Sequence, residues 1–240
     1  MRYFIKAASV LLLLTFWQVA ALWVGRDILL PSPQSVAASL GAILIRDDFW
    51  PSVLATMERF LLAFGLSMLA ALLLGALAGR FSLVYELLSP YLQLARSVPT
   101  VAIILLVMIW LRSHKAPIAV GFLMAFPILY FNVVEGMRSV DKKLLEMAKV
   151  YRLPCWTVFF KLYLPGMKSF LMAGAFSAVG TSLKMVIAAE VFSQPDVGIG
   201  TRFQMARMGL DAPALFAWAI LAVVLNAAVD GALKLMAQSI

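Results

Sequence analysis

Residues 60–79 read FLLAFGLSMLAALLLGALAG, an uncharged stretch bounded by Arg59 and Arg80. A helix needs about 20 consecutive apolar residues to cross the ~30 Å hydrocarbon core of a bilayer. The stretch therefore predicts a membrane-spanning helix. Within it, Gly75 and Gly79 lie four residues apart, a spacing that lets two such helices pack closely.

Comparable apolar stretches recur along the whole chain. Three more contain no charged residue, whereas Glu86 and Arg96 interrupt a fourth and Lys184 lies inside a fifth. Pro99 and Pro127 lie within two of the stretches, where proline removes a backbone hydrogen bond and permits a kink. We predict an all-α membrane protein, a single domain over residues 1–240, with six spans at about 7–25, 59–79, 84–111, 116–135, 169–192 and 213–236.

The composition excludes most other classes of protein. Hydrophobic residues make up 63% of the chain and charged residues 13%, with a mean hydropathy of +0.95, against roughly 45–50% and 25% in soluble domains. Disordered chains are poor in such apolar residues. The net charge of +8 comes mostly from Lys and Arg that flank apolar stretches, so it indicates membrane topology rather than a nucleic-acid partner. A lone Cys155 and a lone His114 give no internal disulfide and argue against a His-based metal site.

Lys and Arg are distributed unequally between the two sides of the predicted membrane. If the N-terminus lies inside, the inner side carries more of them than the outer side, as in most membrane proteins. An even number of spans then places the C-terminus inside as well. The first apolar stretch is longer than the ~7–15 residues of a signal peptide's apolar region, so we interpret it as an uncleaved anchor.

The longest inward-facing polar segment, residues 138–168, has the pattern of two short helices. Ser139 is a candidate cap for the first helix, with Asp141 in its first turn, where the helix dipole favours an anion. Apolar residues then recur on one face of this helix: Val140, Leu144, Met147, Ala148 and Tyr151.

A bend at Leu153-Pro154 ends this first helix, because the residue before proline avoids helical geometry. We expect the second helix to run from Pro154 to Tyr163 or Leu164 and to end at Pro165. Three interpretations of the segment are open at this point: it rests on anionic lipid headgroups, it resembles a calmodulin target, or it docks into a cytoplasmic partner.

Glu146-Met147-Ala148, followed downstream by Leu164-Pro165, resembles the EAA loop of ABC-importer permeases, whose pattern is E-A-A-x-x-x-G with a distal L-P. The resemblance covers residues from about 30 to 235 and is to the nitrate, sulfonate and taurine branch. It is carried by the order of several short motifs: Leu30-Pro31-Ser32-Pro33, Arg96-Ser97-Val98-Pro99-Thr100-Val101-Ala102, Ile109-Trp110, Phe126-Pro127-Ile128, Gly136-Met137-Arg138-Ser139-Val140-Asp141, Ala189-Glu190 and Gly198-Ile199-Gly200.

The resemblance implies a type I ABC importer permease fold, with a cytoplasmic pair of coupling helices at about 139–164. Two permease copies, most simply a homodimer, would form the pathway above two ATPase subunits that use ATP and Mg, while this chain binds no cofactor. A periplasmic or lipid-anchored binding protein would deliver a small anion, such as a sulfonate, taurine or nitrate, to the bacterial cytoplasmic (inner) membrane. The ATPase-coupling residues carried over are Glu146, Met147, Ala148, Tyr151, Arg152, Leu153, Pro154, Leu164 and Pro165.

Two residues depart from the family's loop pattern. The family's glycine falls on Arg152, and the serine that usually follows falls on Pro154. Glycine would permit a left-handed bend between the two helices, whereas arginine must strain into that bend or bend differently.

Four residues are candidates for lining the translocation pathway: Pro99, Asn132, Lys184 and Glu190. Lys184 lies deep in an apolar stretch, where a cation is costly and therefore a functional candidate. It either attracts an anionic substrate, reaches toward the interface, or pairs with a carboxylate such as Glu190 or Asp230. Glu190 matches the family's Ala-Glu pair and is expected to hold the outer gate or its loop.

The sequence contains no P-loop, no Gly-rich phosphate cradle and no nucleophile triad. We therefore expect a transport subunit without an ATPase site of its own. The alternatives are a stand-alone secondary carrier and a membrane-bound enzyme. Sparse His, Cys, Asp and Glu leave no convincing catalytic cluster for an enzyme, and six spans with one large inner amphipathic segment and few intramembrane carboxylates argue against ion coupling within a single chain.

Overall fold

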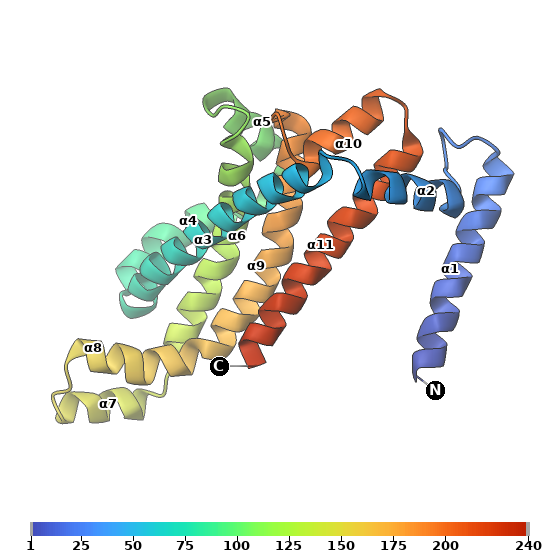
Figure 1. Cartoon of the computed structure of the whole chain (residues 1–240). Coiled ribbons are helices and arrows are strands. Elements are labelled where there is room, and N and C mark those ends of the chain that lie inside the picture. Colours follow the sequence, from blue (N-terminus) through green and yellow to red (C-terminus); the bar gives the residue numbers. More distant parts are fainter. Residues whose placement is uncertain (1, 239–240) are drawn as a thin grey trace.

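The chain folds into helices over residues 2–238, the part that the computed structural model describes, and these residues contain no β-strand. The predicted all-α class is therefore confirmed. In chain order the elements are α1 (Arg2–Val24), α2 (Pro33–Leu44), α3 (Phe49–Arg80), α4 (Ser82–Ser97), α5 (Thr100–Trp110), α6 (Ala116–Arg138), α7 (Lys142–Val150), α8 (Cys155–Val158), the π-helical turn η1 (Phe159–Tyr163), α9 (Leu164–Ser193), α10 (Ile199–Met208) and α11 (Ala212–Gln238) (Figure 1).

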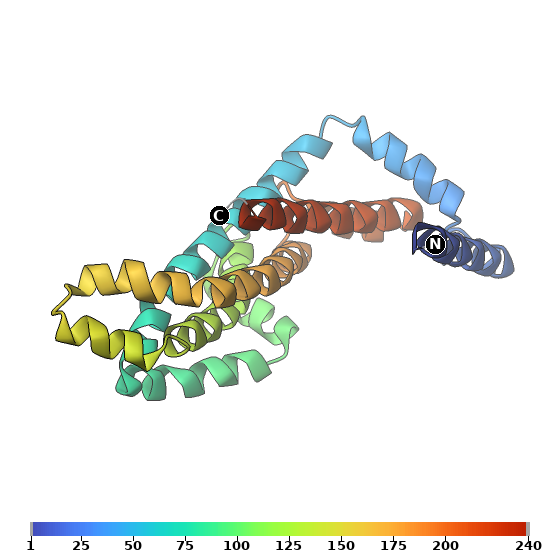
Figure 2. The ribbon, with the colours of Figure 1, turned by 90° about the horizontal axis from the view of Figure 1, so that it is seen from below.

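Helix α6 packs against both α3 and α9, and these three helices form the main core. Small residues allow their backbones to approach. A Cβ atom on Gly75 would lie 2.8 Å from Cγ1 of Val133, and one on Gly79 would overlap Met137. The close packing that the spacing of Gly75 and Gly79 predicts is confirmed. Helix α1 lies outside this core, at the edge of the molecule (Figures 1 and 2).

Within the described residues, four helices are long and apolar enough to cross a membrane: α3, α6, the continuous run Cys155–Ser193 and α11. With 32 residues, α3 is about 48 Å long, which exceeds the ~30 Å thickness of the hydrocarbon core of a bilayer. Helix α1 covers the predicted first span, and its described apolar part is Ala8–Val24. The count of six spans stays a prediction.

The predicted span at 84–111 is wrong as a continuous helix. Helices α4 and α5 are bent by 106° at a break between them. Val98 is extended, with φ −71° and ψ 133°, because the ring of Pro99 disfavours helical geometry in the preceding residue. Proline also lacks the N–H that would continue the helix. A kink was expected at this position, and the chain instead turns sharply.

The helix predicted at 169–192 begins earlier than expected, and Pro165 does not end a helix. α8, η1 and α9 form one continuous run of 39 residues, Cys155–Ser193. In η1 the N–H of Leu164 bonds to the carbonyl of Phe159, one residue farther back than in an α-helix. Pro165 follows this wider turn, in the first turn of α9, where its missing N–H is tolerated.

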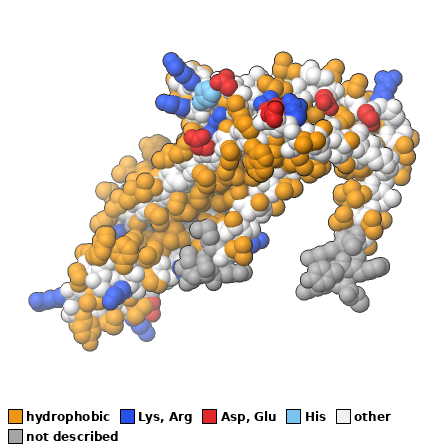
Figure 3. Space-filling model, in the orientation of Figure 1, with side chains coloured by type: hydrophobic (Ala, Val, Ile, Leu, Met, Phe, Trp, Pro, Cys, Tyr) orange, Lys and Arg blue, Asp and Glu red, His pale blue; other side chains and the backbone are white. Residues whose placement is uncertain are grey.

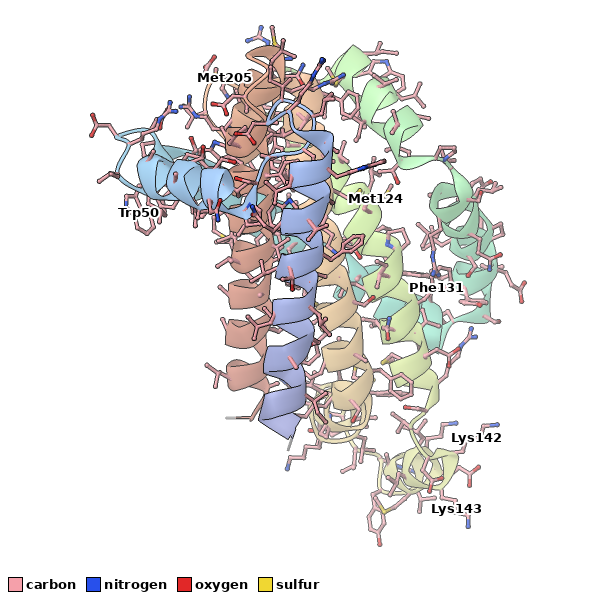
Figure 4. All side chains as sticks on the ribbon, turned by 90° about the vertical axis from the view of Figure 1, so that its right-hand side faces the viewer. Trp50, Met124, Phe131, Lys142, Lys143 and Met205 are labelled. Carbon is pink, nitrogen blue, oxygen red and sulfur yellow. The ribbon has the colours of Figure 1, made fainter. Side chains whose placement is uncertain are left out.

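The two ends of the molecule carry different elements. α7 and α8 project from one end, where α1 also begins and α11 ends, while α10 lies at the other end (Figure 1). Lys142 and Lys143 point away from the core at the first end, and Met205 lies at the opposite end (Figure 4). Charged side chains gather mostly toward the ends, and apolar side chains cover the surface between them (Figure 3). The arrangement is that of a membrane protein, and the cytoplasmic position of the termini stays a prediction.

Candidate functional sites

Helix α7 is held at its start by a side-chain cap. The carboxylate of Asp141 accepts a hydrogen bond from the backbone N–H of Lys143 at 2.9 Å, which satisfies one of the free donors of the first turn. The prediction that Ser139 caps this helix is wrong. Because α6 extends to Arg138, Ser139 follows its last turn, and the Ser139 hydroxyl donates to the carbonyl of Gly136 at 2.8 Å.

The predicted apolar face of α7 is only partly covered by the rest of the chain. Ala148 is 3% exposed, whereas Met147 is 42% and Tyr151 is 72% exposed. Glu146 is exposed as well, and Trp156 on α8 is 75% exposed. An open apolar and aromatic surface beside charged residues is typical of a docking element.

The bend between α7 and α8 is a Schellman motif with arginine at its left-handed position. The N–H of Leu153 bonds to the carbonyl of Ala148 at 2.9 Å, and the N–H of Arg152 bonds to that of Lys149 at 3.0 Å. Arg152 has a φ of +47°, so it adopts the conformation that glycine would take, at a cost of about 1–2 kcal/mol. The sequence predicts that Arg152 either strains into the left-handed bend or changes the bend, and Arg152 takes the strained left-handed conformation. Pro154, in extended conformation, then precedes α8 as its N-cap.

Leu164 and Pro165 lie apart from the other residues that the resemblance assigns to coupling. Both are inside the continuous run Cys155–Ser193, about two turns beyond the exposed Trp156. α8 therefore continues through η1 into α9, and all three belong to one helical run that is a candidate membrane span.

At the opposite end of α9, Glu190 is the centre of a buried polar network. Its side chain is fully buried, and its Oε1 lies 2.5 Å from Nη1 of Arg59 on α3. The hydroxyl of Thr56 donates to the carboxylate, 2.9 Å from Oε2, and the N–H of Gly200 donates to Oε2 at 2.9 Å. The Thr56 hydroxyl also accepts the N–H of Ile199 at 2.9 Å. Two free donors of the first turn of α10 are therefore satisfied, and a carboxylate lies at the positive end of that helix dipole.

Two glycines allow α10 to approach this carboxylate. A Cβ atom on Gly198 would lie 2.8 Å from Cδ of Glu190, and one on Gly200 would overlap Glu190 Cβ and the carbonyl of Ile187. Glu190 thus faces the contact between α3, α9 and α10 and does not face an open pathway. These contacts attach Glu190 to the start of α10, and the position of this loop on the outer side of the membrane stays a prediction.

The sequence pattern does not indicate the partners of Glu190. It marks Arg59 only as the boundary of an apolar stretch and does not single out Thr56. One signal was available, because Thr56 and Arg59 lie three residues apart and so share a helix face. A buried carboxylate needs such hydrogen-bond donors and a cation.

Lys184 lies on an exposed face of α9 that is rich in small and polar residues. The exposed members of this face are Ser169, Ala173, Ser177 and Lys184, with Gly180 and Thr181 half-buried among them. Glu190 forms its ion pair with Arg59, and Oδ2 of Asp230 accepts a hydrogen bond from Asn226 at 3.4 Å. Among the described residues, no ion pair joins Lys184 to either carboxylate, so the pairing expected with Glu190 or Asp230 does not occur within this chain. A face in contact with lipid tails would be expected to carry large apolar side chains.

The structure does not bring the four pathway candidates together. Asn132 on α6 donates to the carbonyl of Ile128 at 2.8 Å and packs against Gly174 of α9, where a Cβ atom would lie 2.8 Å from Asn132 Cβ. Pro99 is exposed at the break between α4 and α5. Lys184 and Glu190 lie on different faces of α9.

The sequence of this chain is similar to those of known transport permeases. A permease of Escherichia coli named for the transport of aliphatic sulfonates is 30% identical over 92% of this chain and 84% of its own length. The riboflavin transport permease of Chloroflexus aurantiacus is 28% identical over 87% of this chain and 78% of its own length. The nitrate import permease of Leptolyngbya laminosa is 29% identical over 63% of this chain and 54% of its own length. The model of one protein family matches residues 60–240. This chain therefore belongs to the family of binding-protein-dependent transport system inner membrane components, the permeases of ABC transporters.

Proposed function

We propose that this chain forms the pathway of an ABC importer for a small organic or inorganic anion, and that the α7–α8 segment couples it to a separate ATPase. In this proposal two copies of the chain enclose the pathway, and two ATPase subunits bind ATP and Mg. A periplasmic or lipid-anchored binding protein docks at the end that carries α10. The chain has no ATPase site of its own, and both termini lie on the cytoplasmic side of the bacterial inner membrane.

The observation that carries the coupling role is the rigid, exposed α7–α8 segment. Hydrogen bonds fix its bend at Arg152 and Leu153, while Met147 and Tyr151 remain open to a partner. The continuous helix Cys155–Ser193 provides a mechanical connection from this segment to the membrane. A flexible loop would absorb the motion of an ATPase, whereas a fixed bend transmits it.

The Glu146→Ala variant tests this role. Glu146 is exposed, so its replacement should leave folding and membrane yield unchanged. We expect reduced co-purification of the ATPase subunit, or reduced ATPase stimulation by the loaded binding protein. Glu86→Ala is the matched control, because Glu86 is equally an exposed glutamate, on α4. Normal uptake and normal ATPase stimulation in Glu146→Ala would refute the role.

The same preparation separates the alternative functions. Uptake by the chain alone, driven by a proton or sodium gradient, would identify a secondary carrier. Chemical conversion of the cargo without transport would identify a membrane-bound enzyme. Uptake that requires ATP and a co-purifying ATPase supports the importer.

Lys184 and the polar face of α9 support an anionic cargo. A cation at mid-span is costly unless it meets water or an anion, and Lys184 has no ion pair within the described residues. In the assembled importer we place this face toward the pathway. Lys184→Met should weaken uptake of a sulfonate while a neutral cargo is unaffected, whereas Lys168→Met, which removes a cation at the end of the span, should leave uptake unchanged. Equal sulfonate uptake in wild type and Lys184→Met would exclude this role.

A further inference from the structure

We propose that a cavity between the end of α3 and the α7–α8 segment binds an anionic phospholipid. The cavity has a volume of about 780 Å³, and α3, α6, α7, α8 and η1 supply its walls. This size is within the range of ligand-binding pockets in proteins. The inference concerns a lipid site and does not depend on the cargo or on the coupling role.

The walls of the cavity are largely apolar. Leu73 and Leu77 of α3 line it and are 60% and 47% exposed, and Phe81, just after α3, is 54% exposed. Trp156 of α8 lines it as well. Exposed apolar surface of this kind is unfavourable in water and favourable beside acyl chains.

The charges of the cavity have one sign. Arg80, Lys149 and Arg152 line it, and no Asp or Glu does. All three basic residues are exposed, and they come from the end of α3 and from α7 with its bend. Basic pockets beside membrane helices on the cytoplasmic side bind anionic lipid headgroups, and phosphate is a preferred partner of Arg.

The position of the cavity favours a lipid over a protein occupant. One wall belongs to α3, a candidate membrane-spanning helix, and the other to the segment that projects beyond the core, so the cavity lies where headgroups meet acyl chains. Trp156 and Tyr163 add amphipathic rings of the type enriched at that depth. An apolar helix of a second copy would cover the apolar walls of the cavity but leave Arg80, Lys149 and Arg152 without a counter-charge.

Cys155 provides a direct probe, because it is the only cysteine of the chain, is exposed and lines the cavity. We would purify the full chain in detergent, titrate phosphatidylglycerol or phosphatidylcholine, and measure the rate at which N-ethylmaleimide modifies Cys155. Phosphatidylglycerol should protect the thiol, and phosphatidylcholine should not. Native mass spectrometry of the wild type should retain phosphatidylglycerol in preference to phosphatidylcholine.

The variant Arg80→Gln/Lys149→Gln tests the basic residues. Each basic side chain near an anionic headgroup contributes about fivefold in affinity, so half-protection should require roughly 25-fold more phosphatidylglycerol. Lys142→Gln/Lys143→Gln is the matched control, because it removes two cations of α7 that do not line the cavity. The variant Cys155→Ser/Val150→Cys places the thiol outside the cavity on the same helix pair and should show no protection.

Several results would overturn the proposal. Equal protection by the two lipids, or full protection retained in Arg80→Gln/Lys149→Gln, would exclude a charge-selective lipid site. Protection that follows protein concentration would indicate a second copy in the cavity. Protection that requires the ATPase would indicate that the ATPase covers it.

Discussion

The buried network around Glu190 allows a quantitative test by a double-mutant cycle. Arg59→Met leaves a carboxylate that is 0% exposed without its cation, and Glu190→Gln leaves the guanidinium, 10% exposed, without its anion. Breaking a buried ion pair by removing one partner costs about 3–5 kcal/mol, so each single variant should lose that much of the free energy of unfolding. The double variant removes both charges, while a glutamine can still accept from Thr56 and Gly200. We expect it to lie within about 2 kcal/mol of the wild type, because replacing both charges of a buried pair is often nearly neutral.

The assay is equilibrium unfolding of the purified chain in mixed detergent and SDS micelles, which reports the free energy of unfolding of each variant. Arg46→Met is the matched control. Arg46 also pairs with a carboxylate, that of Asp48 at 2.7 Å, but its side chain is 56% exposed, and exposed pairs contribute at most about 1 kcal/mol. If the losses of the two single variants simply add in the double variant, Arg59 and Glu190 are not coupled and the network does not hold α10 as argued.

Three further substitutions test the backbone geometry with the same unfolding assay. Arg152→Gly should stabilise the chain by about 1 kcal/mol, because glycine adopts the left-handed conformation without strain, and a loss of stability would show that the bend differs. Gly200→Ala should cost about 3 kcal/mol, because its Cβ would overlap α9, whereas Gly41→Ala, with open space around its Cβ, should not be destabilising. Gly75→Ala should cost about 1–3 kcal/mol through overlap with α6, whereas Gly65→Ala, also in open space, should gain up to about 1 kcal/mol from helix propensity; equal effects in either pair would contradict the packing.

The bent helix pair α7–α8 could be predicted because its residues are contiguous in the chain. Its signals are all local: the motif around Glu146, the proline at position 154, and the arginine at position 152 where the family has glycine. The sequence predicts a second helix that is too short, because Pro165, considered without the preceding turn, indicates the end of a helix. In the fold, the wider turn of η1 precedes that proline, and the helix continues.

The network around Glu190 could not be predicted from local signals. The side-chain partners of Glu190, Arg59 and Thr56, lie 131 and 134 residues away in the sequence, and no periodicity relates positions at such separations. The sequence also leaves open whether Lys184 pairs with a carboxylate. Only the packing of α3 against α9 shows that Glu190 is already paired with Arg59.

By itself, the sequence determined that the chain is helical and lies in a membrane, because a stretch of about 20 apolar residues without a charge is stable only where its backbone hydrogen bonds are made within a helix and its side chains meet lipid. Patterns within a few turns also indicated where α6, α7 and α11 lie, and they indicated α3 only from about residue 59 onward. The tertiary structure alone decided which side chains meet across helices, how sharply the chain turns at Pro99, and which face of α9 remains open. These features depend on contacts between distant segments, and many arrangements of the same helices satisfy the bilayer equally well.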